Sequence, residues 1–218
     1  SVVSNKDLFV EKTCAVLNTK FLNKFLCGNY GINGYSVESI VRLIKFRKVY
    51  DEDIIVVTII GNNMQRAFHN IASQPFWGKK VPTFYPALTE VFFIYLENFK
   101  NRTKYTFDNK YPSEEDKNYY LYLIKNLSEA LSESKKEYLI LYSPEREEIF
   151  DPKHKKNFFI KNTLKNNLDN FFDLSEELIS YKNEFYHDSI HLNASGHEIY
   201  GEIISRKIEE ILLKNNIN

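Results

Sequence analysis

The sequence predicts a three-layer α/β/α fold with a mostly parallel sheet of about five strands. Segments with helical spacing of apolar residues alternate with short apolar runs along the chain, and this alternation is typical of parallel sheets covered by helices. The run at 53–60 (DIIVVTII) is apolar at both odd and even positions and rich in β-branched residues. Such a run suits a central strand that helices cover on each side.

The first part of the chain has two helices and two strands in alternating order. Apolar residues recur at helical spacing over 7–23, and the short apolar segment 25–30 follows as a strand. Ser36 is a suitable N-cap for a second helix, which leads into the strand at 53–60. This order, helix, strand, helix, strand, is the repeat that the fold class requires.

The rest of the chain continues the alternation. Three prolines indicate an irregular loop at 74–86, and helical spacing returns at 87–99. The remaining elements are predicted as helices at 112–132, 156–168 and 194–214 and as strands at 137–142 and 170–174. No internal repeat and no linker rich in Pro, Gly or Ser interrupts them, so we expect one domain over 1–218.

Composition excludes several classes of function. The 29 Lys and Arg residues balance 29 Asp and Glu residues, which argues against a nucleic-acid partner held by a general basic field and against a polybasic membrane anchor. No apolar run approaches the roughly 20 residues that span a bilayer. No signal peptide is visible, but the chain begins at a serine and not at Met, so removal of a leader, anchor or domain stays open, and cell envelope and cytoplasm remain alternatives.

Two further features receive structural interpretations. Cys14 and Cys27 are expected to be buried free thiols, because two cysteines do not make a disulfide framework. The charge-rich segment at 144–157 is expected to be a solvated surface.

Three polar segments follow positions where strands are expected to end. They are 29–36 (NYGINGYS), 61–63 (GNN) and 188–193 (DSIHLN). Sites in parallel sheets form at the carboxyl ends of strands, so we expect the three segments to meet there. Ester chemistry needs an imidazole base, a carboxylate that orients it, and hydrogen-bond donors for the oxyanion.

The three segments contain these groups. Asp188 and His191, three residues apart on a loop, supply the carboxylate and the base. The backbone N–H of Gly34 and the side-chain amide of Asn63 supply the oxyanion donors, and a glycine lets the backbone approach a substrate closely. Each piece alone is more often a plain turn. Their common place at one sheet edge favours the catalytic interpretation.

These segments resemble the sequence blocks of the SGNH hydrolases, which include GDSL lipases, carbohydrate acetylesterases and polysaccharide O-acetyltransferases. NYGINGYS is similar to the glycine block, GNNM to the Gly-x-Asn-Asp block and DSIHLNASGH to the terminal Asp-x-x-His block. The HLN-x-x-GH pattern before an amphipathic helix is the most specific part. The resemblance spans residues 29 to about 204. It implies a serine esterase acting on acetyl or other acyl esters of a carbohydrate, with no cofactor and no metal.

Two departures from the family pattern stand out. Met64 occupies the position where the family usually has Asp, and no Gly-Asp-Ser nucleophile block is present. The segment at 2–10 (VVSNKDLFV) is similar to the stretch after the nucleophile loop in the family. We therefore expect a first strand with the catalytic serine ahead of Ser1. Ser1 itself is the other candidate nucleophile, although it lacks the Gly-Asp context.

Several alternatives stay open. An O-acetyltransferase uses the same acyl-enzyme as an esterase and differs only in the acceptor of the acyl group. A chain without the nucleophile would be a non-catalytic domain that binds a glycan or a protein. A flavodoxin-like domain is a third possibility, but no phosphate loop is visible. His197 is expected on the helix surface, His187 in the loop, and a zinc site at Asp188, His191 and His197 would lack a further ligand pattern.

Overall fold

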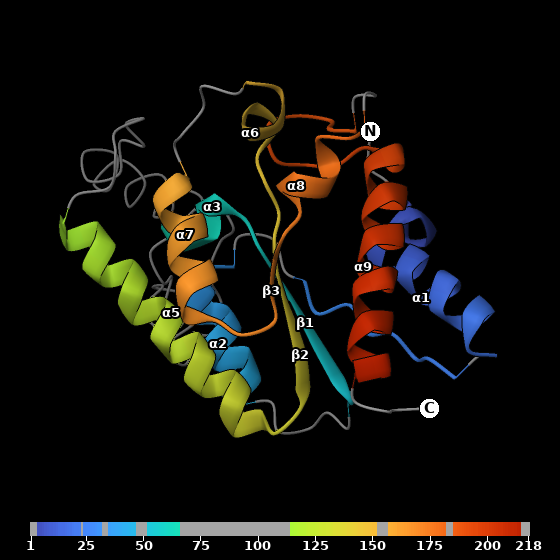
Figure 1. Ribbon diagram of the computed structural model, residues 1–218, viewed down its shortest axis with the longest axis horizontal. Coiled ribbons are helices and arrows are strands. Elements are labelled where there is room, and N and C mark those ends of the chain that lie inside the picture. The colour runs from blue at the N-terminus through green and yellow to red at the C-terminus, as the bar shows by residue number, and fades with distance from the viewer. Residues whose placement is uncertain are drawn as a thin grey trace, which may run out of the picture.

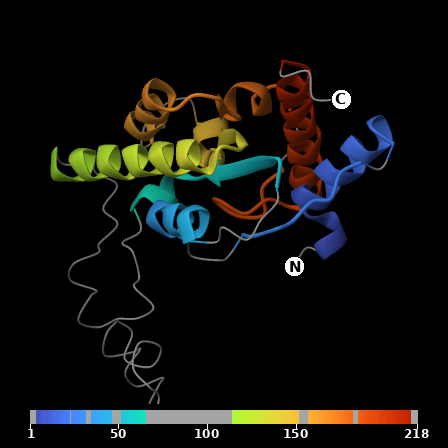
Figure 2. The same cartoon turned by 90° about the horizontal axis from the view of Figure 1, so that it is seen from below.

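The computed structural model describes residues 4–22, 24–31, 35–46, 52–65, 114–151, 157–181 and 185–214. These residues form a mixed α/β fold in which a parallel sheet lies between two groups of helices (Figure 1). One group is α1 (Phe9–Lys20) and α9 (Ala194–Lys214). The other contains α2 (Val37–Phe46), α5 (Glu114–Ser134) and α7 (Phe158–Asn167). The two groups also lie apart in the view from below (Figure 2).

The sheet has three parallel strands within the described residues, in the order β1-β2-β3. They are β1 (Ile54–Ile59), β2 (Glu137–Tyr142) and β3 (Phe171–Asp173). The register pairs Ile54 with Glu137 and Ile140 with Phe171. The α/β class and the parallel sheet are therefore confirmed, whereas the sheet of about five strands is not.

The two faces of β2 belong to two separate hydrophobic clusters. Ile140 packs into the cluster that contains α2, α5 and α7, whereas Leu139 and Leu141 pack against α1 and α9. Successive side chains of a strand point to opposite faces, so the continuous apolar run of β2 fills both clusters. Full burial of one such side chain contributes about 1.5–3 kcal/mol, which makes β2 the strand on which both helix layers depend.

The helices α1 and α9 cross closely because a glycine lies at their contact. A Cβ atom added to Gly201 would lie 2.5 Å from the Cβ atom of Lys12. The hydroxyl of Thr13 donates to the carbonyl oxygen of Gly201 at 3.3 Å. These contacts hold α9 at Gly201 against Lys12 and Thr13 of α1.

Four short elements were not predicted from the sequence. They are η1 (Asn5–Asp7), α3 (Gly61–Gln65), α6 (Arg146–Phe150) and α8 (Ser175–Leu178). None is longer than five residues, which is too short for helical spacing of apolar residues to be visible. The predicted loop at 74–86 and helix at 87–99 lie outside the described residues.

The predicted strand at 25–30 and the predicted free thiols are both wrong. The N–H of Phe25 donates to the Oδ1 atom of Asn18 at 2.8 Å, and Asn18 Nδ2 donates back to the carbonyl of Phe25 at 3.0 Å. The side chain of Asn18, on α1, thus takes up the backbone N–H and carbonyl of Phe25, which in a sheet would bond to a neighbouring strand. Cys14 and Cys27 form a disulfide with a Cα–Cα distance of 5.9 Å. The segment is therefore tied to the outside of α1.

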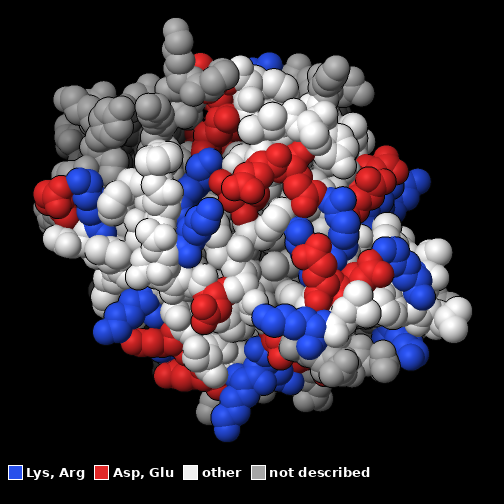
Figure 3. Space-filling view, viewed as in Figure 1, with Lys and Arg blue, Asp and Glu red and all other residues white. Residues whose placement is uncertain are grey.

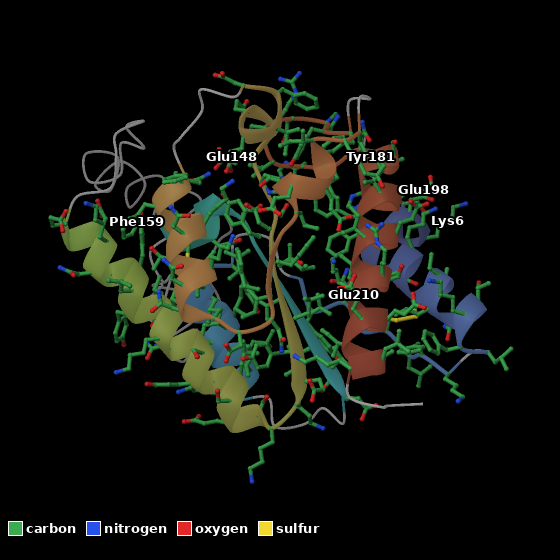
Figure 4. The ribbon with its side chains drawn as sticks, viewed as in Figure 1. Lys6, Glu148, Phe159, Tyr181, Glu198 and Glu210 are labelled. Carbon is green, nitrogen blue, oxygen red and sulfur yellow. A yellow bond between two sulfur atoms is a disulfide. The ribbon has the colours of Figure 1, made fainter. Side chains whose placement is uncertain are left out.

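The segment at 144–157 is not a solvated surface throughout. Glu145 is 5% exposed and Asn157 is fully buried. The Oε1 atom of Glu148 accepts hydrogen bonds from the hydroxyl of Tyr142 at 2.8 Å and from Asn157 Nδ2 at 2.9 Å, and Oε2 lies 3.7 Å from the ammonium of Lys161. Glu148, on α6, is labelled in Figure 4. The frequency of charged residues alone gave the wrong prediction, because Glu145 and Glu148 both accept a hydrogen bond from the buried Asn157 and Glu148 also pairs with Lys161.

Candidate functional site

A pocket of about 400 Å³ lies at the carboxyl ends of β1 and β2. Its wall combines the ends of these strands with the loop at 187–192 and the first turns of α1 and α9. The lining residues are Phe9, Thr58, Ile60, Ser143, His187, Ile190, His191, Leu192, His197 and Tyr200. None of these is a Lys, Arg, Asp or Glu. Among the described residues the wall is therefore uncharged unless a histidine is protonated.

The structure brings Asp188 and His191 together at the rim of this pocket. The Oδ2 atom of Asp188 lies 2.7 Å from His191 Nδ1. The other carboxylate oxygen accepts the backbone N–H groups of Ile190 at 2.9 Å and His191 at 2.8 Å. These two backbone hydrogen bonds, followed by the bond to the imidazole, hold the pKa of Asp188 well below its ordinary value of 3.8. The carboxylate is thus ionised and accepts the proton on Nδ1, which leaves Nε2 as the basic nitrogen.

The loop that bears the pair closes on itself. An antiparallel bridge joins Tyr186 to Leu192, and the N–H of His187 donates to the carbonyl of His191 at 2.7 Å. The N–H of Arg146 donates to the carbonyl of Ser189 at 2.8 Å, which links the loop to the start of α6. Although Asp188 and His191 have exposed side chains, their backbone is held on both sides.

The HLN-x-x-GH pattern has a direct structural explanation. Leu192 is buried, and Asn193 Oδ1 accepts the N–H of Gly196 at 2.9 Å as a cap of α9. A Cβ atom added to Gly196 would lie 2.1 Å from the carbonyl oxygen of Phe185, so this position requires glycine. The pattern therefore sets the distance between the loop and the start of α9.

The side chain of Asn63 makes two hydrogen bonds that were not predicted. Its Oδ1 atom accepts the N–H of Ile60 at 2.8 Å, and its Nδ2 atom donates to the carbonyl of Tyr35 at 2.7 Å. The side chain thus connects the end of β1 to the segment before α2. Asn63 does not line the pocket. Beside it, Met64 is buried in the core, which explains how an apolar residue stands where the resembled family has Asp.

The other predicted site residues divide into those the structure describes and those it does not. Gly34 and Ser1 lie outside the described residues. His187 lies in the loop, as expected. Within the described residues, no group of three or more His, Cys, Asp or Glu side chains is arranged to hold a metal ion.

His197 is not confined to the helix surface as predicted. Its Nδ1 atom accepts the backbone N–H of Phe9 at 3.2 Å, and the two rings stack with centroids 5.8 Å apart. Partial burial lowers the pKa of His197 below its ordinary value of 6.5, although Asp7 opposes the shift. The ring lies between α9 and α1 and lines the pocket. Sequence reasoning missed this, because its partner is 188 residues away.

Ser143 is a second pocket residue that sequence reasoning missed. It directly follows β2, is buried, and lies with its Oγ atom 3.0 Å from the hydroxyl of Tyr200. Burial raises the pKa of Tyr200 to about 12, so this hydroxyl is protonated. A serine at the carboxyl end of a buried strand is a signal that could have been used.

Comparisons with family models, curated proteins and solved structures find no match. Among the described helices, none combines the length and apolarity needed to cross a membrane. Acidic and basic side chains lie interspersed on the face shown in Figure 3, consistent with the equal numbers of both in the sequence.

Proposed function

We propose that this chain belongs to a serine esterase of the SGNH type, acting on acetyl or other acyl esters of a carbohydrate. The observation that carries the proposal is the hydrogen bond between Asp188 and His191 Nδ1 at the rim of an uncharged pocket. This bond fixes the tautomer in which Nε2 is unprotonated, which is the state a general base requires.

In the proposed reaction, His191 Nε2 takes the proton from a serine hydroxyl as its oxygen attacks the ester carbonyl. The imidazolium then returns this proton to the leaving alcohol, and the acyl group stays on the serine. Water, activated in the same way, releases the acid; a sugar hydroxyl in place of water makes the same site an O-acetyltransferase. Asp188 stabilises the imidazolium in both halves of the reaction.

Asn63 and Gly34 are the proposed oxyanion donors. Asn63 is not itself among the residues that line the pocket, but its side chain is bonded to Ile60, which lines it. Asn63 Nδ2 carries two protons, of which the carbonyl of Tyr35 accepts one, and we assign the second to the oxyanion. The bond from Ile60 to Oδ1 prevents the amide from turning over. A donor held in this way has no reorganisation cost when the negative charge develops.

The nucleophile is proposed to come from a strand that precedes Ser1 in the complete protein. The support is the outer edge of β1, which has a strand partner only on its β2 side within the described residues. Its sequence is apolar on both faces, yet Val56 is 36% exposed. Long apolar edge strands are unusual because they present unpaired backbone groups. A further parallel strand beside β1 would cover this edge.

One observation favours a second candidate function, a non-catalytic domain that binds a glycan or a protein. The 218 residues contain no Gly-Asp-Ser block. If none is encoded ahead of Ser1, the cleft would bind its ligand without cleaving it.

The test is labelling of the protein expressed from its complete reading frame with a fluorophosphonate, followed by mass spectrometry. The esterase proposal expects one adduct on a serine, release of acetate from an acetylated xylan, and loss of both in His191→Ala. Neither adduct nor acetate release in the unsubstituted protein would refute the esterase and leave the binding domain.

A further inference from the structure

The pocket beside the Asp188–His191 pair contains a second histidine, His197, whose neutral tautomer is determined by a hydrogen bond from the backbone N–H of Phe9. A backbone N–H can only donate, so the bond from Phe9 requires a lone pair on His197 Nδ1. In the neutral imidazole the proton must then be on Nε2. Burial lowers the pKa of His197, which favours this neutral form.

The orientation of the ring is held by two contacts with Phe9. The hydrogen bond to Phe9 fixes Nδ1, and the stacking on the Phe9 ring restricts rotation about the bond to Cβ. His197 lies in the first turn of α9, which Gly201 and Thr13 hold close to α1. The ring that carries this Nε2–H donor lines the pocket and is held in one orientation, so that its use as a donor has little conformational cost on binding.

The other residues of the pocket wall indicate which kind of ligand could accept a hydrogen bond from His197. The remaining polar groups described there are hydroxyls, such as Ser143 and Tyr200, and the imidazoles of His187 and His191, among mostly apolar side chains. No lining residue is a Lys or Arg that would neutralise a carboxylate or phosphate. An anion entering an uncharged apolar pocket would lose solvation without a compensating partner. The wall suits an uncharged ligand that accepts hydrogen bonds.

We propose that His197 is a substrate-binding residue, whose Nε2–H donates to an uncharged oxygen of the ligand, an ester carbonyl or a sugar hydroxyl. This rests on the proposed function in one respect: the ligand is identified with the acylated carbohydrate that the Asp188–His191 pair would cleave. The donor state of His197 does not depend on that identification.

Two substitutions separate this role from a purely structural one. In His197→Asn, the side-chain oxygen lies near the former Nδ1 and can still accept the N–H of Phe9, but the donor into the pocket is lost. In His197→Gln, the amide nitrogen reaches near the former Nε2, so the donor is retained while the bond to Phe9 is weakened. A structural role and a binding role therefore predict opposite outcomes for the pair.

The binding experiment uses the protein from its complete reading frame in a His191→Ala background, so that the probe is not consumed. The probe is peracetylated methyl xyloside, and sodium acetate is the charged control. We expect His197→Asn to weaken probe binding about tenfold, equivalent to roughly one hydrogen bond, with an unchanged thermal midpoint. We expect His197→Gln to keep the affinity and lower the midpoint. The opposite pattern, or acetate binding as tightly as the probe, would overturn the proposal.

A second measurement reads the donor directly. Long-range ¹H–¹⁵N correlation spectra distinguish the two neutral imidazole tautomers, and we expect His197 to carry its proton on Nε2 at pH 7 and its Nε2–H signal to shift on addition of the probe. A proton on Nδ1, or no shift at saturation, would overturn the inference. Failure of the esterase proposal gives a different result. The protein would then release no acetate, while His197 would still carry its proton on Nε2 and its Nε2–H signal would still shift on addition of the probe.

Discussion

At the scale of single residues, the Asp188–His191 pair shows how a short loop can orient a base without burial. Both side chains are largely exposed, yet the carboxylate accepts two backbone N–H groups as well as the imidazole. The spacing of three residues is what permits this arrangement, because the backbone between the two side chains turns back onto the carboxylate. The pair was predictable from sequence for that reason, since all of its contacts are local.

Substitution of these residues in the complete protein should rank their contributions. His191→Ala should abolish hydrolysis of an acetylated sugar, because no other base contacts Asp188 in the described loop. Asp188→Asn should lower turnover by up to about 10⁴, since the imidazole loses its orienting acceptor. Asn63→Ala should cost roughly 10²–10³ as one oxyanion donor is removed. Steady-state kinetics check the order; a His191→Ala protein with unreduced kcat would contradict the assignment.

The pKa of Asp188 gives a testable pH dependence. Because the pKa is lower in the folded loop than the ordinary 3.8, the ionised carboxylate stabilises the loop above pH 3.8, and this stabilisation is lost as the pH falls below that value. We expect the ¹³C shift of the Asp188 carboxyl to stay that of the ionised form when the pH falls to about 3.8. Protonation at or above its ordinary pKa would show that the two backbone hydrogen bonds are absent.

Gly196 should be intolerant of any side chain. A methyl group there would meet the carbonyl oxygen of Phe185 at 2.1 Å, so either α9 or the loop must move. We expect Gly196→Ala to lower the free energy of unfolding by about 2 kcal/mol or more, whereas Ser195→Ala, at an exposed neighbouring position, should change it by less than about 0.5 kcal/mol. Urea unfolding of the two variants checks this, and equal effects would refute the close contact.

At the scale of elements, the sequence predicted what depends on local periodicity and missed what depends on distant partners. The strand at 137–142 and the helix at 194–214 occur with the predicted bounds. The strand is a continuous apolar run, and the apolar residues of the helix keep helical spacing along its whole length. The segment at 25–30 has strand-like composition, but Asn18 and the disulfide determine its conformation. His197 was expected on the helix surface and Ser143 was given no site role, because their partners Phe9 and Tyr200 are near them only in the folded chain.

The Cys14–Cys27 disulfide should contribute substantially to the stability of this part of the fold. The two residues are 13 apart in sequence, and closure of a loop of about 15 residues stabilises a folded chain by about 3 kcal/mol in the chain-entropy estimate. Cys14→Ser/Cys27→Ser should lower the free energy of unfolding by about this amount, measured in urea. Addition of dithiothreitol should reproduce the loss in the unsubstituted protein but change nothing in the double variant. An unaffected unsubstituted protein would contradict the bond. Such a bond is typical of proteins that fold in an oxidising compartment.

At the scale of the whole molecule, the strand proposed to precede Ser1 would turn β1 from an edge strand of the described sheet into an inner strand. The pocket lies where the ends of β1 and β2 meet the loop of Asp188 and the first turns of α1 and α9. A serine on a strand beside β1 would reach this edge from the side that faces away from β2. The same added strand would therefore supply the nucleophile and cover the apolar edge that includes Val56.

If such a strand precedes Ser1, the 218-residue chain and the protein expressed from its complete reading frame should differ in hydrogen exchange. Hydrogen exchange should protect the amides along the outer edge of β1 only in the complete protein, because a partner strand would then accept their hydrogen bonds. The amides of β2, which pair with β1 and β3 in both proteins, are the internal control. Ester hydrolysis should appear together with the protection of β1 and be absent from the shorter chain. If the complete protein hydrolyses the ester while the outer amides of β1 exchange as fast as in the shorter chain, the serine reaches the site by another route and the added strand is refuted.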